Sequence, residues 1–466
     1  MDLAPSLPDD LLADVLHRLA ARGLAASRCV CKSWRRVVDG RRLLRADLLP
    51  LSLGGIFLNY HDLNFTQFLN RPTTGTAVSG RLDYTCHASE PGRYSLPRPY
   101  AYGHCNGLLL FDHCVVNPAT QQWALLPSPP DEMPQPPPPG MYFRRKQYLV
   151  FDPTLSPNSF ELLILPDVPS KLNNNDECEE FEWPPSMLIL PVFSSKTGSW
   201  EEVPFCREGE AAGTLPGMVG SSRISNGRLS AYWQGALYIC YSDCFVLRIS
   251  LSDKKYQVIT LPPDVCAYNR EFYMGKSVKG IYCASLLPPS PYHAGAAKLQ
   301  VWFLSSPTEW VLKHDSDIFH ILPYLSFDKH CNRPWILQEF DYWYEYDASQ
   351  VSDEEDAMAD SNEALVEEAK FDWDSDNDDV LEPGSKNEAS YMYILGFHPY
   401  KEVVLFSLWE RVLAYHWASS KIQHLGKLFP NFYLKRRIDF HHTIATDSFP
   451  YTPCWLGELP EKLNLS

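Results

Sequence analysis

The sequence lacks the long apolar runs and leader segments that mark membrane and secreted proteins. No stretch of about 18 consecutive apolar residues occurs, so no transmembrane helix and no membrane contact are expected. The first residues contain no basic region followed by an apolar run, so no secretory signal is expected. The 13 cysteines are odd in number and scattered, unlike the framework of a small disulfide-bonded protein. We therefore expect reduced thiols and a location in the cytoplasm, the nucleus or both.

Motifs of the common enzyme and metal sites are missing as well. The chain contains no G-x-x-x-x-G-K-[ST], no G-x-S-x-G, no H-E-x-x-H and no G-x-G-x-x-G after a strand. The pairs Cys29/Cys31 and Cys240/Cys244 have no second pair at zinc-finger spacing, so we interpret Cys29 and Cys31 as helix-packing residues. We expect no metal, no cofactor and no catalytic residue. An enzyme whose site is built from distant loops in a central channel is the alternative.

Negative charge is concentrated in one segment of the chain. The net charge is −16, and 15 Asp and Glu against two Lys between Val351 and Glu388 account for −13 of it. The remainder shows no basic stripe that could neutralise phosphates, so no nucleic-acid partner is expected. Few apolar residues and repeated like charge predict a disordered acidic insert at about residues 348–390.

The first 40 residues have the periodicity of short helices. Apolar residues form one stripe at helical spacing: Leu11, Leu12, Val15, Leu16 and Leu19. Gly23 interrupts the pattern, and two further helices are expected at about residues 24–31 and from residue 32 onward. Three helices of this size bury little area, so the unit needs a partner surface. That surface is either the domain that follows or a second protein.

A dozen residues of this stretch resemble the F-box in order and spacing. They read L-P-x-D-L-L, an apolar pair, Arg-Leu, a further Leu and R-C-V-C-K-x-W, over about residues 5–45. Ala20 departs from the pattern, because many members have a second proline there. The resemblance implies a three-helix F-box domain over residues 1–48 that docks on the Skp adaptor of an SCF-type cullin–RING ubiquitin ligase. The residues implied to face or support that interface are Leu7, Pro8, Leu11, Leu12, Val15, Leu16, Leu24, Cys29, Val30 and Trp34.

Beyond residue 49 the pattern changes to short apolar runs separated by turn residues. Five blocks are typical of strand, polar turn and strand: 108–127, 187–205, 236–262, 299–313 and 403–428. The positions that mark a weak repeat are Trp123, Trp200, Tyr256, Trp310 and about Gln423. The gaps between them are 77, 56, 54 and about 113 residues. The first gap has room for an extra loop or part of another blade, and the last contains the acidic insert.

A four-stranded repeat of about 50 to 60 residues predicts an all-β propeller of kelch type, with about six blades or alternatively seven. Stacked sandwiches are the competing interpretation. The repeats also resemble the F-box-associated propeller regions of plant F-box proteins, in the Asn-Pro-x-Thr-x-x-Trp turn at 117–123 and the QYLVFDP run at 147–153. We expect the propeller over residues 50–466, closed by pairing residues 54–60 or 102–111 with a late strand. The acidic insert and a proline-dense, solvated loop at 127–140 interrupt it.

The two regions together favour a non-catalytic adaptor. The F-box would bind the Skp adaptor and, through it, cullin, while the propeller holds a protein substrate for ubiquitination by other subunits. Substrate contacts are expected on loops at one propeller face, where Trp233, Arg270 and Tyr273 are candidates. Structural packing is the simpler explanation for each of them, so the substrate-binding residues stay open. A Skp-binding module that acts outside a ubiquitin ligase is a further alternative.

Overall fold

A computed structural model provides the structure of the protein. It describes residues 8–19, 24, 27, 30–41, 43, 52–60, 63, 65–71, 78–82, 100–138, 141–142, 144–167, 170–171, 181–215, 229–241, 245–263, 265, 270–288, 297–319, 335–338, 392–429, 445–455 and 459. The expected acidic insert therefore lies outside the described residues.

A small helical unit, made of the described residues from 8 to 43, begins the chain. It contains α1 (Asp9–His17) and α3 (Lys32–Gly40), and residues 24 and 27 between them also have helical conformation. Its core consists of Leu12, Ala13, Leu16, Leu24, Val37 and Val38, with Trp34 and Leu43 packed against it. Cys31 is exposed and precedes α3, so its interpretation as a packing residue was wrong, whereas Cys29 lies outside the described residues. Within the part of the chain that the structure describes, no helix is long and apolar enough to span a membrane.

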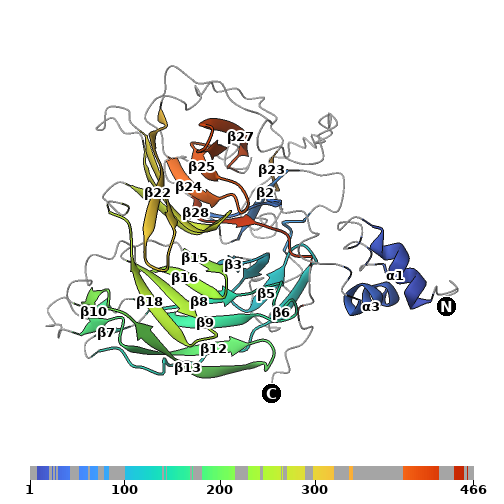
Figure 1. Ribbon diagram of the computed structural model, residues 1–466, viewed down its shortest axis with the longest axis horizontal. Helices are drawn as coiled ribbons and strands as arrows, with labels where there is room; N and C mark the ends of the chain where they lie inside the picture. Colours follow the sequence, from blue (N-terminus) through green and yellow to red (C-terminus); the bar gives the residue numbers. More distant parts are fainter. Residues whose placement is uncertain are drawn as a thin grey trace, which may run out of the picture.

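The described strands of the body form four separate four-stranded sheets and one eight-stranded sheet, and each group of four strands forms one blade of a propeller (Figure 1). From the centre outward, blade 1 contains β28 (Ala445–Tyr451), β1 (Gly55–Tyr60), β2 (Gln67–Asn70) and β23 (Ile336–Gln338). Blade 2 contains β3 (Gly103–Cys105), β4 (Leu108–Leu110), β5 (Cys114–Asn117) and β6 (Gln122–Leu125). Blade 3 contains β8 (Arg145–Val150), β9 (Glu161–Pro166), β12 (Met187–Ser194) and β13 (Ser199–Glu208).

The remaining three blades follow in chain order. Blade 4 contains β15 (Ser230–Trp233), β16 (Ala236–Tyr241), β17 (Phe245–Ser250) and β18 (Lys255–Thr260). Blade 5 contains β19 (Glu271–Ser277), β20 (Gly280–Leu287), β21 (Lys298–Leu304) and β22 (Trp310–Asp317). Blade 6 contains β24 (Met392–Phe397), β25 (Val403–Leu408), β26 (Arg411–His416) and β27 (Lys421–Lys427). Two short ribbons accompany blade 3, namely β7 (Met141–Tyr142) with β10 (Ser170–Lys171) and β11 (Glu182–Trp183) with β14 (Gly213–Thr214).

The ring is closed by the first and the last of the described strands. β28 pairs antiparallel with β1, so that Ile56 lies opposite Pro450 and Leu58 opposite Ser448. The pairing confirms residues 54–60, and not 102–111, as the early partner of the late strand. Neighbouring inner strands also contact one another, as in β15 with β19, β19 with β24 and β24 with β28. The described strands therefore form six blades.

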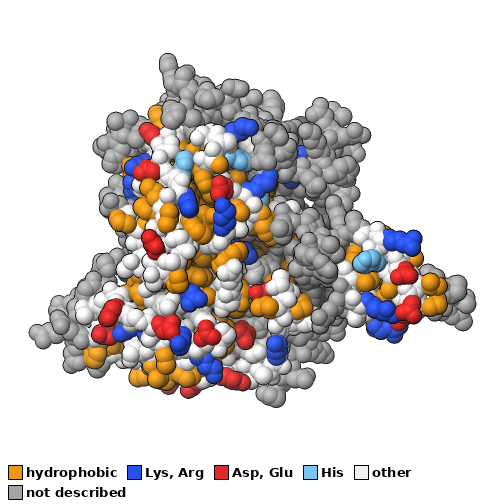
Figure 2. Space-filling model, viewed as in Figure 1, with side chains coloured by type: hydrophobic (Ala, Val, Ile, Leu, Met, Phe, Trp, Pro, Cys, Tyr) orange, Lys and Arg blue, Asp and Glu red, His pale blue; other side chains and the backbone are white. Residues whose placement is uncertain are grey.

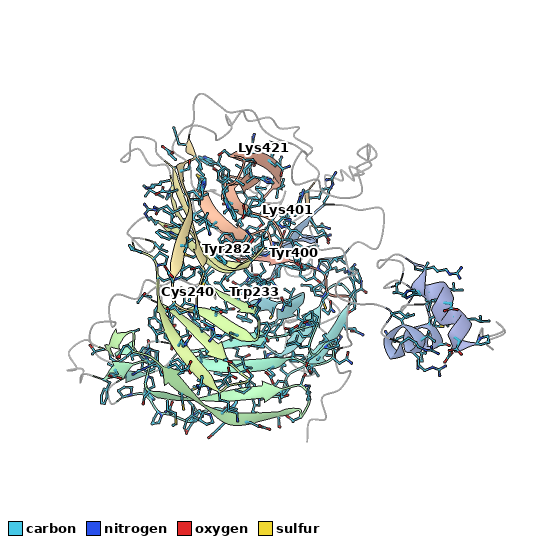
Figure 3. All side chains as sticks on the ribbon, viewed as in Figure 1. Trp233, Cys240, Tyr282, Tyr400, Lys401 and Lys421 are labelled. Carbon is cyan, nitrogen blue, oxygen red and sulfur yellow. The ribbon has the colours of Figure 1, made fainter. Side chains whose placement is uncertain are left out.

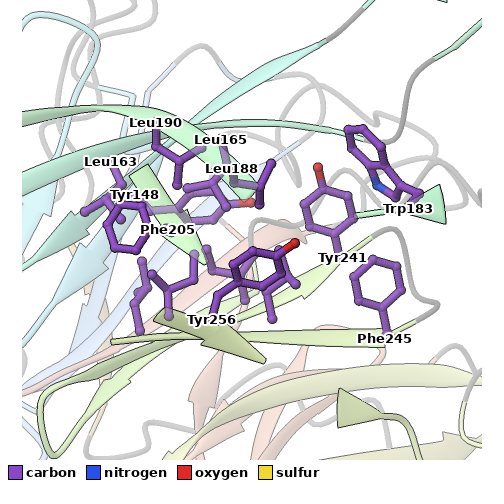
Figure 4. Close-up of a cluster of buried hydrophobic side chains, with 14 of the residues drawn as sticks. Tyr148, Leu163, Leu165, Trp183, Leu188, Leu190, Phe205, Tyr241, Phe245 and Tyr256 are labelled. Atoms are coloured by element: carbon purple, nitrogen blue, oxygen red, sulfur yellow. The ribbon is translucent and has the colours of Figure 1, made fainter. Parts of the chain in front are cut away.

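Six hydrophobic clusters lie between adjacent blades, one at each junction of the ring. β1 shows how they arise, because Ile56 and Leu58 pack toward blade 6 while Phe57 packs toward blade 2. A strand covered on both faces needs a nearly continuous apolar sequence, and all six residues of β1 are buried. Figure 4 shows the cluster between blades 3 and 4, to which Tyr148 of blade 3 and Tyr256 of blade 4 contribute.

Blades 3 and 4 are also joined along their outer edges. β13 runs parallel to β18, with Arg207 opposite Tyr256, and this pairing merges the two blades into one eight-stranded sheet. The Lys255 ammonium lies 2.6 Å from a carboxylate oxygen of Glu208 at the same edge. Because both side chains are about half exposed, this ion pair adds little stability in water, and the backbone pairing is what joins the two blades.

The repeat expected from the sequence corresponds to the outermost strands. The marker positions lie in five of them: Trp123 in β6, Trp200 in β13, Tyr256 in β18, Trp310 in β22 and Gln423 in β27. The long first gap holds one blade with additional loops and ribbons. The last gap contains β23, which the sequence did not predict and which completes blade 1 from the middle of the chain.

The proline-dense loop is attached to blade 3 over its described residues, 127–138. Arg145 donates hydrogen bonds to the carbonyl oxygens of Pro130 and Asp131, at 2.6 and 2.9 Å. The Gln135 amide bonds both the carbonyl of Met187 and the N–H of Ile189, each at 3.0 Å. The side chain of Gln135 thus pairs with β12 as a neighbouring strand would, while every described residue of the loop is partly or fully exposed.

Candidate functional site

The helical unit presents apolar side chains to solvent. Leu12 and Leu16 of α1 are 3% and 0% exposed and form its core, whereas Leu11 and Val15 are 53% and 51% exposed. These two side chains are four residues apart and therefore lie on one face of α1. Val30 before α3 is also exposed, at 63%. Figure 2 shows hydrophobic side chains on the surface of this unit beside charged ones.

Exposed ion pairs connect the two helices of the unit. Arg36 of α3 lies 3.4 Å from a carboxylate oxygen of Asp9, and Arg41 contacts Asp10. Such pairs contribute little stability in water, because both partners are well solvated. The small core therefore holds the helices together, and the exposed apolar face is available to a further protein.

The structure describes eight of the ten residues implied by the F-box resemblance. Four are exposed, namely Pro8, Leu11, Val15 and Val30; three are buried, namely Leu12, Leu16 and Leu24; and Trp34 is partly buried. Leu7 and Cys29 lie outside the described residues. The unit also contacts the propeller, because Trp455, which follows β28, packs against both the helical core and the cluster between blades 1 and 2.

A second candidate site is a cavity of about 600 Å³ at the centre of the ring. Every blade contributes to its wall, through the inner strands β3, β15, β19 and the segments that end or follow β8, β24 and β28. Trp233, Tyr273, Phe397 and Tyr400 are among the aromatic residues that line it. Figure 3 shows Trp233 and Tyr400 near the middle of the molecule. We call this cavity the channel pocket.

Two tight turns of the same kind line the channel pocket. Asn106-Gly107 joins β3 to β4, and Gln234-Gly235 joins β15 to β16. All four residues have positive φ, which is typical of two-residue hairpin turns and favours Asn and Gly. The turns differ in their surroundings, since a Cβ on Gly107 would lie 2.5 Å from the Cβ of Cys454, while nothing lies within 4 Å of one on Gly235.

A hydrogen-bonded chain crosses the channel pocket. The Lys276 ammonium on β19 donates to the side-chain oxygen of Asn106, and the Asn106 amide nitrogen donates to the carbonyl of Phe151 at 2.6 Å. Burial lowers the pKa of Lys276, and the nearby Cys105 and Asp152 oppose that shift. The chain links blades 2, 3 and 5 and places one cation in an aromatic cavity.

The neighbouring His104 and Cys105 are not arranged as a nucleophile and base. Burial raises the pKa of the Cys105 thiol to about 12, and its sulfur bonds the carbonyl of Phe151 at 3.4 Å. Burial, together with the charge of Lys276, lowers the pKa of His104 to about 4. A neutral thiol beside a neutral imidazole suits packing, because nucleophilic cysteine chemistry needs the thiolate. Among the described residues, no group of three His, Cys, Asp or Glu side chains could hold a metal ion.

Of the three residues suggested from sequence for substrate contact, two line the channel pocket. These are Trp233 and Tyr273, whereas Arg270 is absent from its wall. Arg270 instead donates to Ser285 at 3.3 Å and Gln300 at 3.2 Å within blade 5, which is a structural role. Sequence reasoning missed Lys276, for which an ordinary β-strand gives no local signal. The Asn106-Gly107 dipeptide did carry a hairpin signal.

Comparison with known proteins places the helical unit in a family. Residues 5–46 match the F-box domain, so the chain carries an F-box domain at its N-terminal side. Two Arabidopsis thaliana proteins named as F-box proteins are similar to it. One is 28% identical over 130 residues, which cover 26% of this chain and 33% of the relative, and the other is 27% identical over 111 residues, which cover 24% and 29%. The match thus spans about a third of the length of these relatives.

Proposed function

We propose that the chain is the substrate-recognition subunit of an SCF-type cullin–RING ubiquitin ligase. In this proposal the F-box domain, over residues 1–48, binds the Skp adaptor and through it cullin. The propeller, over residues 50–466, recruits a protein substrate, and other subunits transfer the ubiquitin. The chain contributes no catalytic residue and acts by raising the effective concentration of substrate lysines near the conjugating enzyme. Its place is the cytoplasm, the nucleus or both.

The exposed pair Leu11 and Val15 is the observation that carries this proposal. A unit with a core of six buried apolar residues is marginal alone, and it leaves these two large side chains about half in water. They lie within the stretch that matches the F-box domain. A second protein that covers this face would bury them and enlarge the core of the unit. That is the arrangement expected of an adaptor-docking module.

The test is capture of a purified plant Skp adaptor and cullin by the full chain and by Leu11→Ala/Val15→Ala. We expect the wild type to capture both partners and the double variant to bind the adaptor about 10- to 100-fold more weakly, as for central interface residues. Because both side chains are exposed, the helical unit should stay folded. The far-ultraviolet circular dichroism spectrum and the propeller's unfolding midpoint should therefore match the wild type.

The matched control is Val278→Ala/Leu312→Ala, which removes two exposed apolar side chains from blade 5 at 38% and 41% exposure. Its adaptor affinity should equal that of the wild type. The proposed docking face would be refuted if both double variants lost adaptor affinity equally. It would also be refuted if Leu11→Ala/Val15→Ala bound the adaptor as tightly as the wild type. Capture of the adaptor without cullin would favour a Skp-binding module that acts outside a ubiquitin ligase. Capture of neither partner would favour an enzyme with its site in the central channel.

A further inference from the structure

Among the described residues, the channel pocket contains one cation without an ionic partner. Lys276 is the one Lys or Arg among the described residues that line it, and Asp152 is the one Asp or Glu. One carboxylate oxygen of Asp152 already accepts hydrogen bonds from the Thr154 N–H and hydroxyl, at 2.9 and 2.6 Å, and from the Leu155 N–H at 3.3 Å. Asp152 acts on Lys276 through space, but within the described residues no carboxylate forms an ion pair with the ammonium.

The ammonium of Lys276 has unused hydrogen-bonding capacity. It carries three N–H donors, and Asn106 accepts from one of them. Removing an ammonium from water without an anion is unfavourable, which is why burial lowers the pKa of Lys276. An anionic group that enters the cavity would supply acceptors for the remaining donors and offset that cost.

The walls determine what else the ligand carries. Trp233 and Tyr400 are partly exposed and offer aromatic surface, and the largely buried Tyr273, Phe397, Pro399 and Pro450 also line the cavity. A volume of about 600 Å³ lies within the range of pockets that hold small organic molecules. It would equally admit one or two residues of a peptide. A ligand that combines an aromatic body with one carboxylate satisfies both the walls and the ammonium.

We propose that the channel pocket binds an aromatic carboxylate, with its carboxylate beside Lys276 and its ring among the aromatic walls. The carboxylate belongs either to a free small acid or to the C-terminal residue of a peptide. In the peptide case the inference deepens the proposed function and rests on it. The two fail separately, because adaptor capture depends on Leu11 and Val15 and not on Lys276.

The test is isothermal titration of the full-length protein with benzoate and with a hexapeptide ending in phenylalanine. Benzamide and the C-terminal amide of the same peptide are the uncharged controls. We expect saturable binding of at least one acid, at least tenfold tighter than of its amide, and a change in tryptophan fluorescence that follows the same curve. If both benzoate and the peptide bind, the pocket accepts the aromatic carboxylate as a free acid and as a peptide C-terminus. If the peptide alone binds, the pocket is assigned to a protein substrate.

Variants distinguish the channel pocket from other binding. Lys276→Met should weaken acid binding at least tenfold, while Lys279→Met, in the exposed turn that follows β19, should leave it unchanged. Leu155→Glu gives a second measure that spares the fold, because this rim residue is 75% exposed. The added negative charge should weaken acid binding severalfold relative to Leu155→Gln. Absence of saturable binding, equal affinity for acid and amide, or unchanged binding by Lys276→Met and Leu155→Glu would overturn the proposal.

Discussion

The ammonium of Lys276 is hydrogen-bonded to Asn106, which lies 170 residues earlier in the chain. Lys276 belongs to blade 5 and Asn106 to blade 2, and a ring of six places these two blades opposite each other. The bond therefore crosses the central channel, where most contacts join neighbouring blades. It both fixes the position of the cation and ties the two halves of the ring together.

Replacing Asn106 with glycine should lower the free energy of unfolding by about 1–2 kcal/mol, because the partly buried ammonium loses its amide acceptor. Glycine adopts the positive φ of 47° at this position without strain, so the turn itself is kept. Chemical denaturation of both proteins measures the difference. Gln234→Gly is the matched control, since Gln234 has the same φ of 47° and is exposed. That variant should be as stable as the wild type or slightly more so, and an equal loss in both would argue against a role for the amide.

Gly107→Ala should be much more destabilising than Gly235→Ala, although both glycines occupy the second position of a tight turn. Their φ values are 93° and 80°, so each alanine pays a similar backbone cost of about 1–2 kcal/mol. At Gly107 the new methyl group would also lie 2.7 Å from the carbonyl oxygen of Thr452, which forces the segment after β28 to move. We expect a further loss of about 1–3 kcal/mol, seen as a lower unfolding midpoint. Equal midpoints for the two variants would contradict the close contact.

His104 should make the protein less stable in mild acid. Burial lowers the folded-state pKa of its imidazole to about 4, below the usual value of 6.5. The fold keeps its full stability from this group above pH 6.5 and loses stability as the pH falls toward 4. The reason is that His104 binds a proton in the unfolded chain but stays neutral in the folded chain. The contribution is on the order of 3 kcal/mol. The quantity to measure is the unfolding free energy of the wild type minus that of His104→Gln, from pH 7 to pH 4. This difference should become smaller as the pH is lowered.

Glu271 provides a control of opposite sign. Burial raises the pKa of its carboxyl group to about 7, so its folded form binds a proton more readily than its unfolded form. Stability from this group is complete below pH 4.5 and is lost as pH rises through 7. Glu271→Gln should thus gain stability relative to wild type as pH rises over that interval. If His104→Gln also gained stability relative to wild type as the pH rises, burial of His104 could not be the cause of the acid sensitivity.

The sequence predicted those parts of the fold that depend on local pattern. Alternating apolar runs and polar turns located the strands, and Trp123, Trp200, Tyr256 and Trp310 marked outer strands because each blade repeats the same arrangement. β23 was missed, since a strand of three residues carries too little pattern to stand out. The sequence does not distinguish residues 54–60 from 102–111 as the partner of the late strand. Strands that pair across several hundred residues share no local sequence pattern.

The candidate sites show the same limit at the level of single residues. Leu11 and Leu12 are adjacent members of one apolar stripe, yet one is 53% exposed and the other 3%. A stripe of five apolar positions is broad enough to face both a core and a partner, so periodicity could not separate the two roles. In the sequence Lys276 resembles any lysine in a strand. It becomes the cation of the channel pocket only because closure of the ring brings it to Asn106.

The pairing of β28 with β1 has a consequence for the order of events on the ribosome. Asn59 and Asp447, which meet across that pairing, are 388 residues apart. At about 5–20 residues per second, β1 therefore waits roughly 20 to 80 s for its partner to be synthesised. Throughout that interval one edge and much of the apolar surface of a strand that ends fully buried are accessible to other chains. We therefore expect the first blade to depend most on protection by chaperones, until β28 has left the ribosome.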